Sequence, residues 1–269
     1  MSKYADQISA MVWSYSRLSA FEQCKYAFYL KYIIANDDEY LAEGNFWAEL
    51  GSFVHEILEM IFNGNLDPND APSYFINHYD TNVFYTASES IMQKSFDDCL
   101  LFLSEADFSK LQPFNVLGVE KELSLQISGY DFKGYIDLLL QDKENGDIII
   151  VDHKSSAYPL SEKTGKPLKA HARNFESYKK QMYLYCHAVK QLYGKFPRWI
   201  IWNHFKAQKI VRIPFEEQEY QKTMRWFRST IKSIGKEEAF PETIDYFYCH
   251  HLCDFRNCCE YRQYSDQSR

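Results

Sequence analysis

The chain lacks a long apolar run and an excess of positive charge, and each absence narrows what it can do. No stretch approaches the roughly 20 apolar residues that a membrane span needs. The first ten residues, MSKYADQISA, contain no signal-peptide core. We therefore expect a cytoplasmic protein with no membrane partner. Because the net charge is −7, the chain is unlike the basic proteins that coat duplex DNA, and a nucleic-acid role requires a local basic groove or bound cations.

The composition is that of a globular protein. The 269 residues are 46% hydrophobic and 25% charged, which suits one large domain or two small ones. Aromatic residues reach 17%. A tyrosine-rich core and surface explains them more simply than stacking platforms for unpaired bases, which are the functional alternative. The seven cysteines are expected to be thiols or metal ligands, because disulfides are rare in the cytosol.

Hydrophobic periodicity predicts an α/β domain with helical additions. The predicted helices cover 14–34, 46–62, 86–105, 174–194 and 215–235. Ser16 or Ser19 is the expected N-cap of the first helix. Asn174 is the expected N-cap of the fourth, and Gly194 lies just past its last turn. The predicted strands cover 116–129, 130–140, 147–154, 198–205 and 209–215. A short cysteine-rich tail follows the last helix.

The stretch IIIVDHK ends a run built for burial with a carboxylate and an ammonium group. Asn145-Gly146 just before it predicts a hairpin with a two-residue turn. That turn places Asp137 opposite Lys154. Since strand side chains alternate, Asp137, Asp152 and Lys154 then project from one face. A longer loop that keeps the parity preserves this arrangement, whereas a one-residue slip destroys it.

Two neighbouring carboxylates repel each other and favour a cation between them. Such oxygen ligands suit Mg²⁺ or Mn²⁺. A lysine beside them can hold a water or stabilise charge on a phosphate, as metal-assisted hydrolysis requires. An Asp–Lys ion pair at a strand end explains the hairpin equally well.

Five short motifs, in one order along the chain, resemble the PD-(D/E)XK nuclease superfamily. GYID and IVDHK resemble its Asp…Asp-x-Lys core. SYSRLSAFEQCKYAFYLKYI, GSFVHEILE, QMYLY and CDFRNCC resemble motifs of RecB-like nucleases, a group that includes CRISPR-adaptation exonucleases. The resemblance runs from about Ser14 to Cys259. It implies a restriction-endonuclease-like core, with a central mixed sheet flanked by helices, over about 45–215 of a single domain, 1–269.

The resemblance also implies roles for individual residues. Metal ligands are His55, Asp137, Asp152, the backbone carbonyl of His153, and Glu120 through water. Lys154 becomes the catalytic lysine. Gln181 and Tyr185, four residues apart on one helix face, become substrate contacts, although a polar–aromatic surface pair has the same spacing. Because imidazole is a softer ligand than carboxylate, His55 favours Mn²⁺ over Mg²⁺.

The family's terminal cysteines imply a [4Fe–4S] cluster that joins helix 14–34 to the tail 236–269. The implied ligands are Cys24, Cys249, Cys253 and Cys259. Three residues separate Cys249 from Cys253, where the family commonly has two. Zn²⁺ is an alternative, because it accepts Cys₄ or Cys₃His and His250 could replace Cys249. Cys258 could take part instead of Cys259, and unligated thiols are a third option.

A basic segment follows the catalytic strand. It carries Lys163, Lys166, Lys169 and Arg173. Such charge runs are usually solvated faces. The position next to Lys154 favours instead a loop that binds the phosphates of a nucleic acid, together with Tyr185.

The sequence thus predicts a metal-dependent DNA exonuclease that acts on single-stranded ends in recombination, repair, or phage or CRISPR DNA processing. One alternative is a catalytically weak DNA-binding module that works with a helicase or recombination partner. The other is a zinc-stabilised RNA-processing protein.

Overall fold

The structure, a computed structural model, describes residues 3–34 and 41–268. Contacts within the chain form two compact units. The first consists of Met1–Asn45, Ser124–Lys133 and Lys222–Arg269, and the second of Phe46–Leu123 and Gly134–Gln221. The prediction of a single domain over 1–269 stays a prediction. Within the described residues, no helix is long and apolar enough to cross a membrane.

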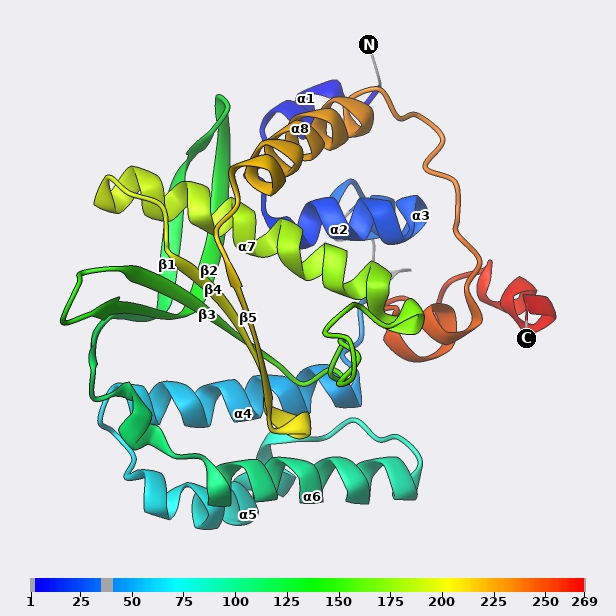
Figure 1. The fold of residues 1–269 in the computed structure, drawn as a ribbon. Coiled ribbons are helices and arrows are strands. Elements are labelled where there is room, and N and C mark those ends of the chain that lie inside the picture. Colours follow the sequence, from blue (N-terminus) through cyan, green and yellow to red (C-terminus); the bar gives the residue numbers. More distant parts are fainter. Residues whose placement is uncertain (1–2, 35–40, 269) are drawn as a thin grey trace. The chain divides into compact units, whose positions relative to one another are not determined.

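The elements follow the α/β pattern predicted from the sequence (Figure 1). The helices are α1 Ala5–Ser9, α2 Tyr15–Gln23, α3 Lys25–Tyr32, α4 Phe46–Phe62, α5 Ala71–Asn82, α6 Glu89–Glu105, α7 Ala172–Tyr193 and α8 Glu217–Ile234. The strands are β1 Phe114–Ile127, β2 Tyr130–Asp142, β3 Ile148–Lys154, β4 Trp199–His204 and β5 Lys209–Pro214. Short turns of helix cover Pro68–Asp70, Phe108–Leu111, Lys169–His171, Phe205–Ala207, Tyr248–Leu252 and Arg262–Ser268.

The five strands form one mixed sheet in the order β1-β2-β3-β4-β5. β2 pairs with β3, and β4 with β5, in antiparallel fashion, whereas β3 and β4 are parallel and are connected through α7. A parallel pair needs such a crossover, because the chain must return to the same end of the sheet. The predicted α/β class, with a central mixed sheet flanked by helices, is confirmed.

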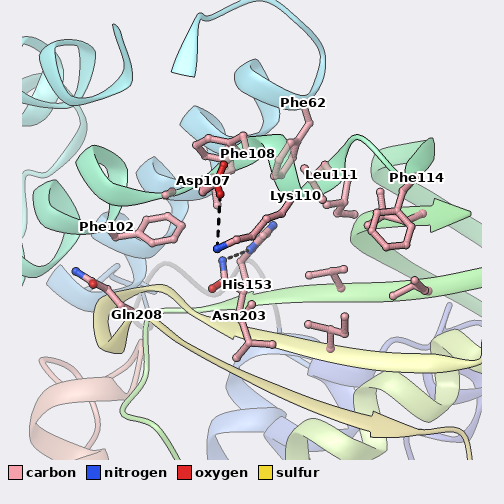
Figure 2. Close-up of a pocket in the computed structure, with 18 of the residues that line it drawn as sticks. Phe62, Phe102, Asp107, Phe108, Lys110, Leu111, Phe114, His153, Asn203 and Gln208 are labelled. Atoms are coloured by element: carbon pink, nitrogen blue, oxygen red, sulfur yellow. Dashed lines mark hydrogen bonds and ion pairs between the residues drawn. The ribbon is translucent and has the colours of Figure 1, made fainter. Parts of the chain in front are cut away.

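Strand β3 is buried on both faces, which explains why its apolar run is continuous rather than alternating. Ile150 on one face and Ile149 on the other are 0% and 5% exposed. The face with Ile149 also carries Leu138, Leu140 and Val151. It lines an apolar cavity of about 380 Å³, ringed by phenylalanine side chains (Figure 2).

The register of the β2–β3 hairpin differs from the predicted one. Leu138 pairs with Val151, and extending this register by one residue places Asp137 across from Asp152 rather than Lys154. The two-residue turn was wrong because β2 ends at Asp142 and β3 begins only at Ile148. The Asp142 carboxylate accepts hydrogen bonds from two backbone N–H groups of this longer loop. The shift of two residues preserves the predicted parity of the carboxylates and the lysine.

Helix α4 has the bounds that its apolar stripe predicts, Phe46–Phe62. Its buried residues pack with those of α5 and α6 in one core cluster. Helix α5 was not predicted, because only Ala71 and Phe75 of its twelve residues are buried and its apolar pattern is weak. Gly194 ends α7 in the left-handed conformation, φ 75°, as predicted.

In the first unit, the single helix predicted over 14–34 is wrong. Cys24 is extended, with φ −156° and ψ 114°, and separates α2 from α3. The N-cap is Ser14, whose side chain accepts a hydrogen bond from the Arg17 N–H, and not Ser16 or Ser19. The break removes Cys24 from a helical surface and leaves its thiol buried beside the tail.

Candidate metal centre

The end of β3 and the middle of β2 bring the predicted acidic and basic side chains together. Asp152 and Lys154 come from β3, where the Lys154 Nζ atom lies 2.7 Å from Asp152 Oδ2. Asp137 comes from β2, and its Oδ2 atom accepts a hydrogen bond of 2.7 Å from the His153 backbone N–H. Asp152 is only 2% exposed. The strands thus hold two carboxylates and an ammonium group side by side, with Asp152 almost fully buried.

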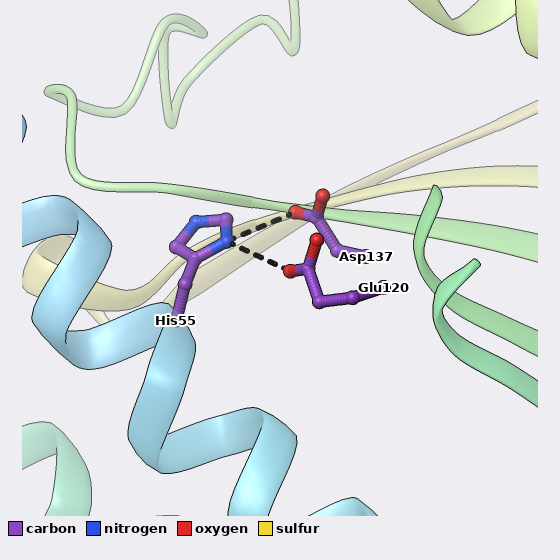
Figure 3. Close-up of side chains that lie close together, drawn as sticks. All are labelled: His55, Glu120 and Asp137. Atoms are coloured by element: carbon purple, nitrogen blue, oxygen red, sulfur yellow. Dashed lines mark ion pairs between the residues drawn. The ribbon is translucent and has the colours of Figure 1, made fainter. Parts of the chain in front are cut away.

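Helix α4 adds an imidazole to this cluster. His55 Nδ1 lies 3.5 Å from Glu120 Oε1 and 3.6 Å from Asp137 Oδ2 (Figure 3). His55 Nε2 lies 3.0 Å from the backbone carbonyl of His153. One ligand atom each from His55, Glu120 and Asp137 lies within 4.8 Å of the others. One nitrogen and two carboxylate oxygens at this spacing are a candidate divalent-metal site.

Glu120 reaches the cluster through an unusual backbone. Its φ is 42°, in the left-handed region, although it belongs to a strand. A non-glycine residue in this region carries strain of about 1–3 kcal/mol, which the surrounding structure must hold in place. Such strain is common where a side chain serves a site rather than the fold. Here the distorted strand points the Glu120 carboxylate at His55.

A glycine lies where α4 approaches the end of β3. Gly51 lies one turn before His55, and a Cβ atom added there would sit 3.4 Å from Ser155 Oγ. Such a contact is close but ordinary, so α4 packs directly against Ser155, just past the end of β3. The motif GSFVHEILE thus places a residue without a side chain one turn before His55, where the helix faces Ser155.

Burial and mutual charge perturb the acids and bases of the cluster. Burial, and then the charge of Asp152, raise the pKa of Asp137 to about 7, against the opposing charges of His55 and Lys154. Burial disfavours the protonated form of His55, but Glu120, Asp137 and Asp152 outweigh it and raise the pKa of His55. Burial also opposes the charge of Lys154, yet Asp152 and Asp137 raise its pKa further above the usual value. The cluster therefore binds protons that a divalent cation would displace.

Lys154 is held by three neighbours from the sheet and α7. Besides Asp152, its Nζ atom contacts Gln181 Oε1 at 3.0 Å and lies 5.0 Å from the centre of the Tyr178 ring. Gln181 in turn donates a hydrogen bond of 3.2 Å to the Tyr185 hydroxyl. The predicted Gln181–Tyr185 pair therefore faces the cluster. Tyr185 is only 6% exposed, and burial raises its pKa to about 12, so its role as a substrate contact stays a prediction.

The basic segment lies outside the residues that line the metal cluster. All four basic residues are exposed. Lys163, Lys166 and Lys169 lie on the connection between β3 and α7, and Arg173 lies in the first turn of α7. None of the four lines the cavity around Asp137 and Asp152. Their predicted contact with nucleic acid stays a prediction.

The cavity that holds the cluster has a volume of about 730 Å³. Its wall includes two aromatic residues that were not predicted as site residues, Trp47 and Tyr135. The sequence contained a signal for both. Trp47 precedes His55 by two turns of α4, and Tyr135 precedes Asp137 by two residues on β2, so each shares a face with a predicted ligand.

His153 connects the two faces of the sheet. Its backbone carbonyl faces His55, whereas its side chain lines the apolar cavity on the other face (Figure 2). Burial, then the nearby His55 and Lys154, lower the pKa of His153 to about 3, so the imidazole is neutral. The imidazole Nδ1 atom lies 3.0 Å from Asn203 Nδ2, and the imidazole ring stacks on the ring of Phe62. These contacts fix the side chain and with it the carbonyl.

In the first unit, the four predicted cluster cysteines surround one small cavity. Cys24, Cys249, Cys253 and Cys259 line an enclosed space of about 20 Å³, and Cys258 does not. The Cys258 Sγ atom is turned towards the carbonyls of Leu41 and Phe255, at 3.8 and 3.7 Å.

His250, the alternative ligand, is also turned away from this cavity. Its Nδ1 atom accepts a hydrogen bond from Arg262, and its Nε2 atom lies 3.3 Å from Asp266. The four predicted thiols therefore line one space, and Cys258 and His250 do not. Which group they hold, if they are not free thiols, stays a prediction.

One family model matches most of the chain. The sequence model described as the PD-(D/E)XK nuclease superfamily matches residues 12–260. No curated protein matches the chain. A solved structure titled "Crystal structure of SSO0001" aligns with 78% of this chain and 96% of its own, at 16% sequence identity and a TM-score of 0.34.

Proposed function

The chain belongs to the PD-(D/E)XK nuclease superfamily, and on this premise we propose that it is a divalent-metal-dependent DNA exonuclease that hydrolyses phosphodiester bonds from single-stranded ends. The observation that carries the proposal is the convergence of His55, Glu120 and Asp137, with Lys154 beside them. Family membership alone implies a metal-dependent nuclease. The preference for single-stranded DNA ends, of either polarity, goes beyond what the family implies. So does a role in recombination, repair, or phage or CRISPR DNA processing.

The donor set fits a hard divalent cation with some nitrogen affinity. His55, Glu120 and Asp137 would hold it, with Asp152 and the His153 carbonyl beside them. Oxygen-rich sites select Mg²⁺ or Mn²⁺, and the imidazole favours Mn²⁺. When bound, the cation supplies an activated water and neutralises charge on the phosphate.

Lys154 acts on the same phosphate as a fixed cation. Asp152, Gln181 and the ring of Tyr178 hold its ammonium group in one position. Its raised pKa keeps it charged throughout the physiological range, so it can hydrogen-bond the attacking water and stabilise negative charge that develops in the transition state. Asp137 and His55 release their protons when the site is filled.

A digestion series tests this function. End-labelled and circular DNA, each single- and double-stranded, are incubated with the protein and Mn²⁺. We expect release of label from single-stranded ends and survival of the circles. Asp137→Asn should abolish cleavage, whereas Asp131→Asn, an exposed position on the same strand, should retain it. Cleavage by the Asp137→Asn variant contradicts the assignment, and metal-dependent DNA binding without cleavage by the wild type supports a binding module instead.

We also propose that Cys24, Cys249, Cys253 and Cys259 hold a [4Fe–4S] cluster, which joins 14–34 to the tail 236–269 in one working nuclease domain. That these four cysteines line one space supports this, although the space of about 20 Å³ is smaller than the cluster, so the thiols must move apart to admit it. Among the described residues, no three of these sulfur atoms lie within 4.8 Å of one another. A single Zn²⁺, with Zn–S bonds of about 2.3 Å, needs a tighter group, so the spacing favours the larger cluster. A reducing, cytoplasmic location belongs to the same proposal.

The cluster is tested by its iron content and colour. Protein purified without oxygen should be brown, with a broad absorbance near about 400 nm. Cys24→Ser should lose this band, and Cys258→Ser, which removes the thiol turned away from the cavity, should keep it. Zinc in place of iron, or equal loss in both variants, contradicts the proposed ligand set.

A further inference from the structure

Two aromatic side chains stand on the walls of the metal cavity. Trp47 lies on the face of α4 that carries Gly51 and His55, each four residues after the last. Tyr135 lies on the face of β2 that carries Asp137, and it is 42% exposed. Trp47 is half-buried, because it also packs against the core cluster of α4, α5 and α6. One ring thus belongs to the helix wall and the other to the strand wall. Neither has a role in the metal chemistry described above.

The cavity wall carries more negative than positive side chains, so uncharged aromatic rings are better suited than most of the wall to contact DNA. Its lining includes five carboxylates and two basic side chains: Glu56, Glu59, Glu120, Asp137 and Asp152 against Lys154 and His55. A DNA phosphate is therefore repelled by most of the wall, and a bound cation offsets this only at the reacting phosphate. Neighbouring nucleotides need contacts that carry no charge.

We propose that Trp47 and Tyr135 are base-stacking platforms that bind the unpaired nucleotides next to the scissile phosphate. This inference rests on the proposed nuclease function and names what selects its substrate. Stacking on aromatic side chains is tolerant of sequence and needs no counter-charge. It also requires a free base face, which a paired and stacked duplex does not offer. The two rings therefore give the site its preference for single strands.

The dimensions of the cavity agree with this occupant. Its volume of about 730 Å³ lies within the roughly 300–1,000 Å³ of sites that enclose a small molecule, which is sufficient for a nucleotide. Gly51, between Trp47 and His55 on the helix, contributes no side chain to the space between ring and imidazole.

The exposure of Tyr135 distinguishes it from the tyrosine predicted from the family motif. Tyr185 is 6% exposed and its hydroxyl is bonded to Gln181, so its ring faces are covered. Tyr135 lines the cavity and is 42% exposed, and its hydroxyl donates to Glu122 Oε2 at 3.3 Å. That contact fixes the ring at the edge of the site.

Variants and a substrate that lacks the base test the proposal together. The substrates are a single-stranded oligothymidylate and the same strand with abasic terminal nucleotides, both digested with Mn²⁺. Trp47→Ala and Tyr135→Ala should each raise KM for the intact strand by roughly 5- to 100-fold, the value of one stacked base, with kcat changed less than about twofold. On the abasic strand the same variants should change KM by less than about twofold. Trp47→Phe and Tyr135→Phe should recover most of the loss.

The controls separate stacking from structure and from the proposed function. Trp199→Ala removes a half-buried tryptophan on the opposite face of the sheet and should leave both substrates unaffected. Mn²⁺ affinity, measured by calorimetry, should be unchanged in all variants. An equal loss on intact and abasic strands, or no loss on either, overturns the stacking role while the nuclease assignment stands. A wild type that cleaves neither strand overturns both.

Discussion

Replacing Lys154 by methionine separates the stability of the cluster from its catalysis. The Lys154 side chain is 18% exposed and that of its partner Asp152 is 3% exposed. Methionine keeps most of the apolar stem but removes the cation. Asp152 then faces Asp137 across the hairpin with no ammonium group beside it. Removing one partner of a buried ion pair costs about 3–5 kcal/mol, because the other charge stays buried.

The loss of folding stability can be measured, and so can its recovery when a metal binds. In a chain of this length, it lowers the melting temperature of the metal-free protein by roughly 6–20 °C. A divalent cation should restore much of it, because the two carboxylates now lack a competing ammonium group. Mn²⁺ at about 100 times its Kd contributes about 2.7 kcal/mol. Melting curves with and without Mn²⁺ measure both effects. Cleavage should remain at least about 100-fold lower even when the metal has restored the fold.

Lys179 on α7 is a matched control. Its side chain is 17% exposed, nearly the same as that of Lys154, and it pairs with Glu176 at 2.5 Å and Glu219 at 3.3 Å. The side chains of these partners are 46% and 27% exposed, so Lys179→Met should cost no more than about 1 kcal/mol and leave cleavage intact. If Lys154→Met melts no lower than Lys179→Met, or still cleaves DNA at the wild-type rate, the reasoning about the buried cluster is refuted.

Two further predictions concern the metal ligands. The pKa of Asp137 is raised to about 7 and that of His55 is raised too, so Mn²⁺ must displace protons to bind. The affinity for Mn²⁺ should therefore fall by about tenfold or more per pH unit as the pH drops from 7 to 6. Calorimetry in buffers of different ionisation enthalpy measures the protons released, and an affinity that does not change with pH contradicts the ligand set. Glu120→Gly should relieve the backbone strain at φ 42°, so the metal-free protein should melt no lower than the wild type while Mn²⁺ affinity falls at least about tenfold; unchanged affinity would exclude Glu120 as a ligand.

The sequence was sufficient to predict the core of the fold, because periodicity determines it. The stripe of α4 and the unbroken apolar run of β3 led to bounds close to those observed. The alternation of β2 and β3 was sufficient to place Asp137, Asp152 and Lys154 on one face, even though the register was wrong by two residues. Parity survives an even shift, and for this reason the site prediction did not depend on the turn length.

Other features depend on contacts between distant segments and could not be predicted. The left-handed backbone conformation of Glu120 depends on the contacts of β1 at the site, and no residue pattern in GVEKEL predicts it. The break at Cys24 was hidden in a sequence with a continuous helical pattern. Trp47 and Tyr135 were visible in the sequence, but their relevance required the cavity that α4 and β2 form together.

The end of β3 shows how one short strand can build a reactive site. Its alternation directs Asp152 and Lys154 to one face and the side chain of His153 to the other, while the His153 backbone meets both His55 and Asp137. Burial of Asp137 and the nearby charge of Asp152 raise the pKa of Asp137 to about 7, and a bound cation would offset both effects. The same apolar run that packs the sheet therefore buries the carboxylates at its end, and their burial favours the binding of a cation. A strand buried on one face only would leave these acids solvated, with ordinary pKa values and a weaker demand for a cation.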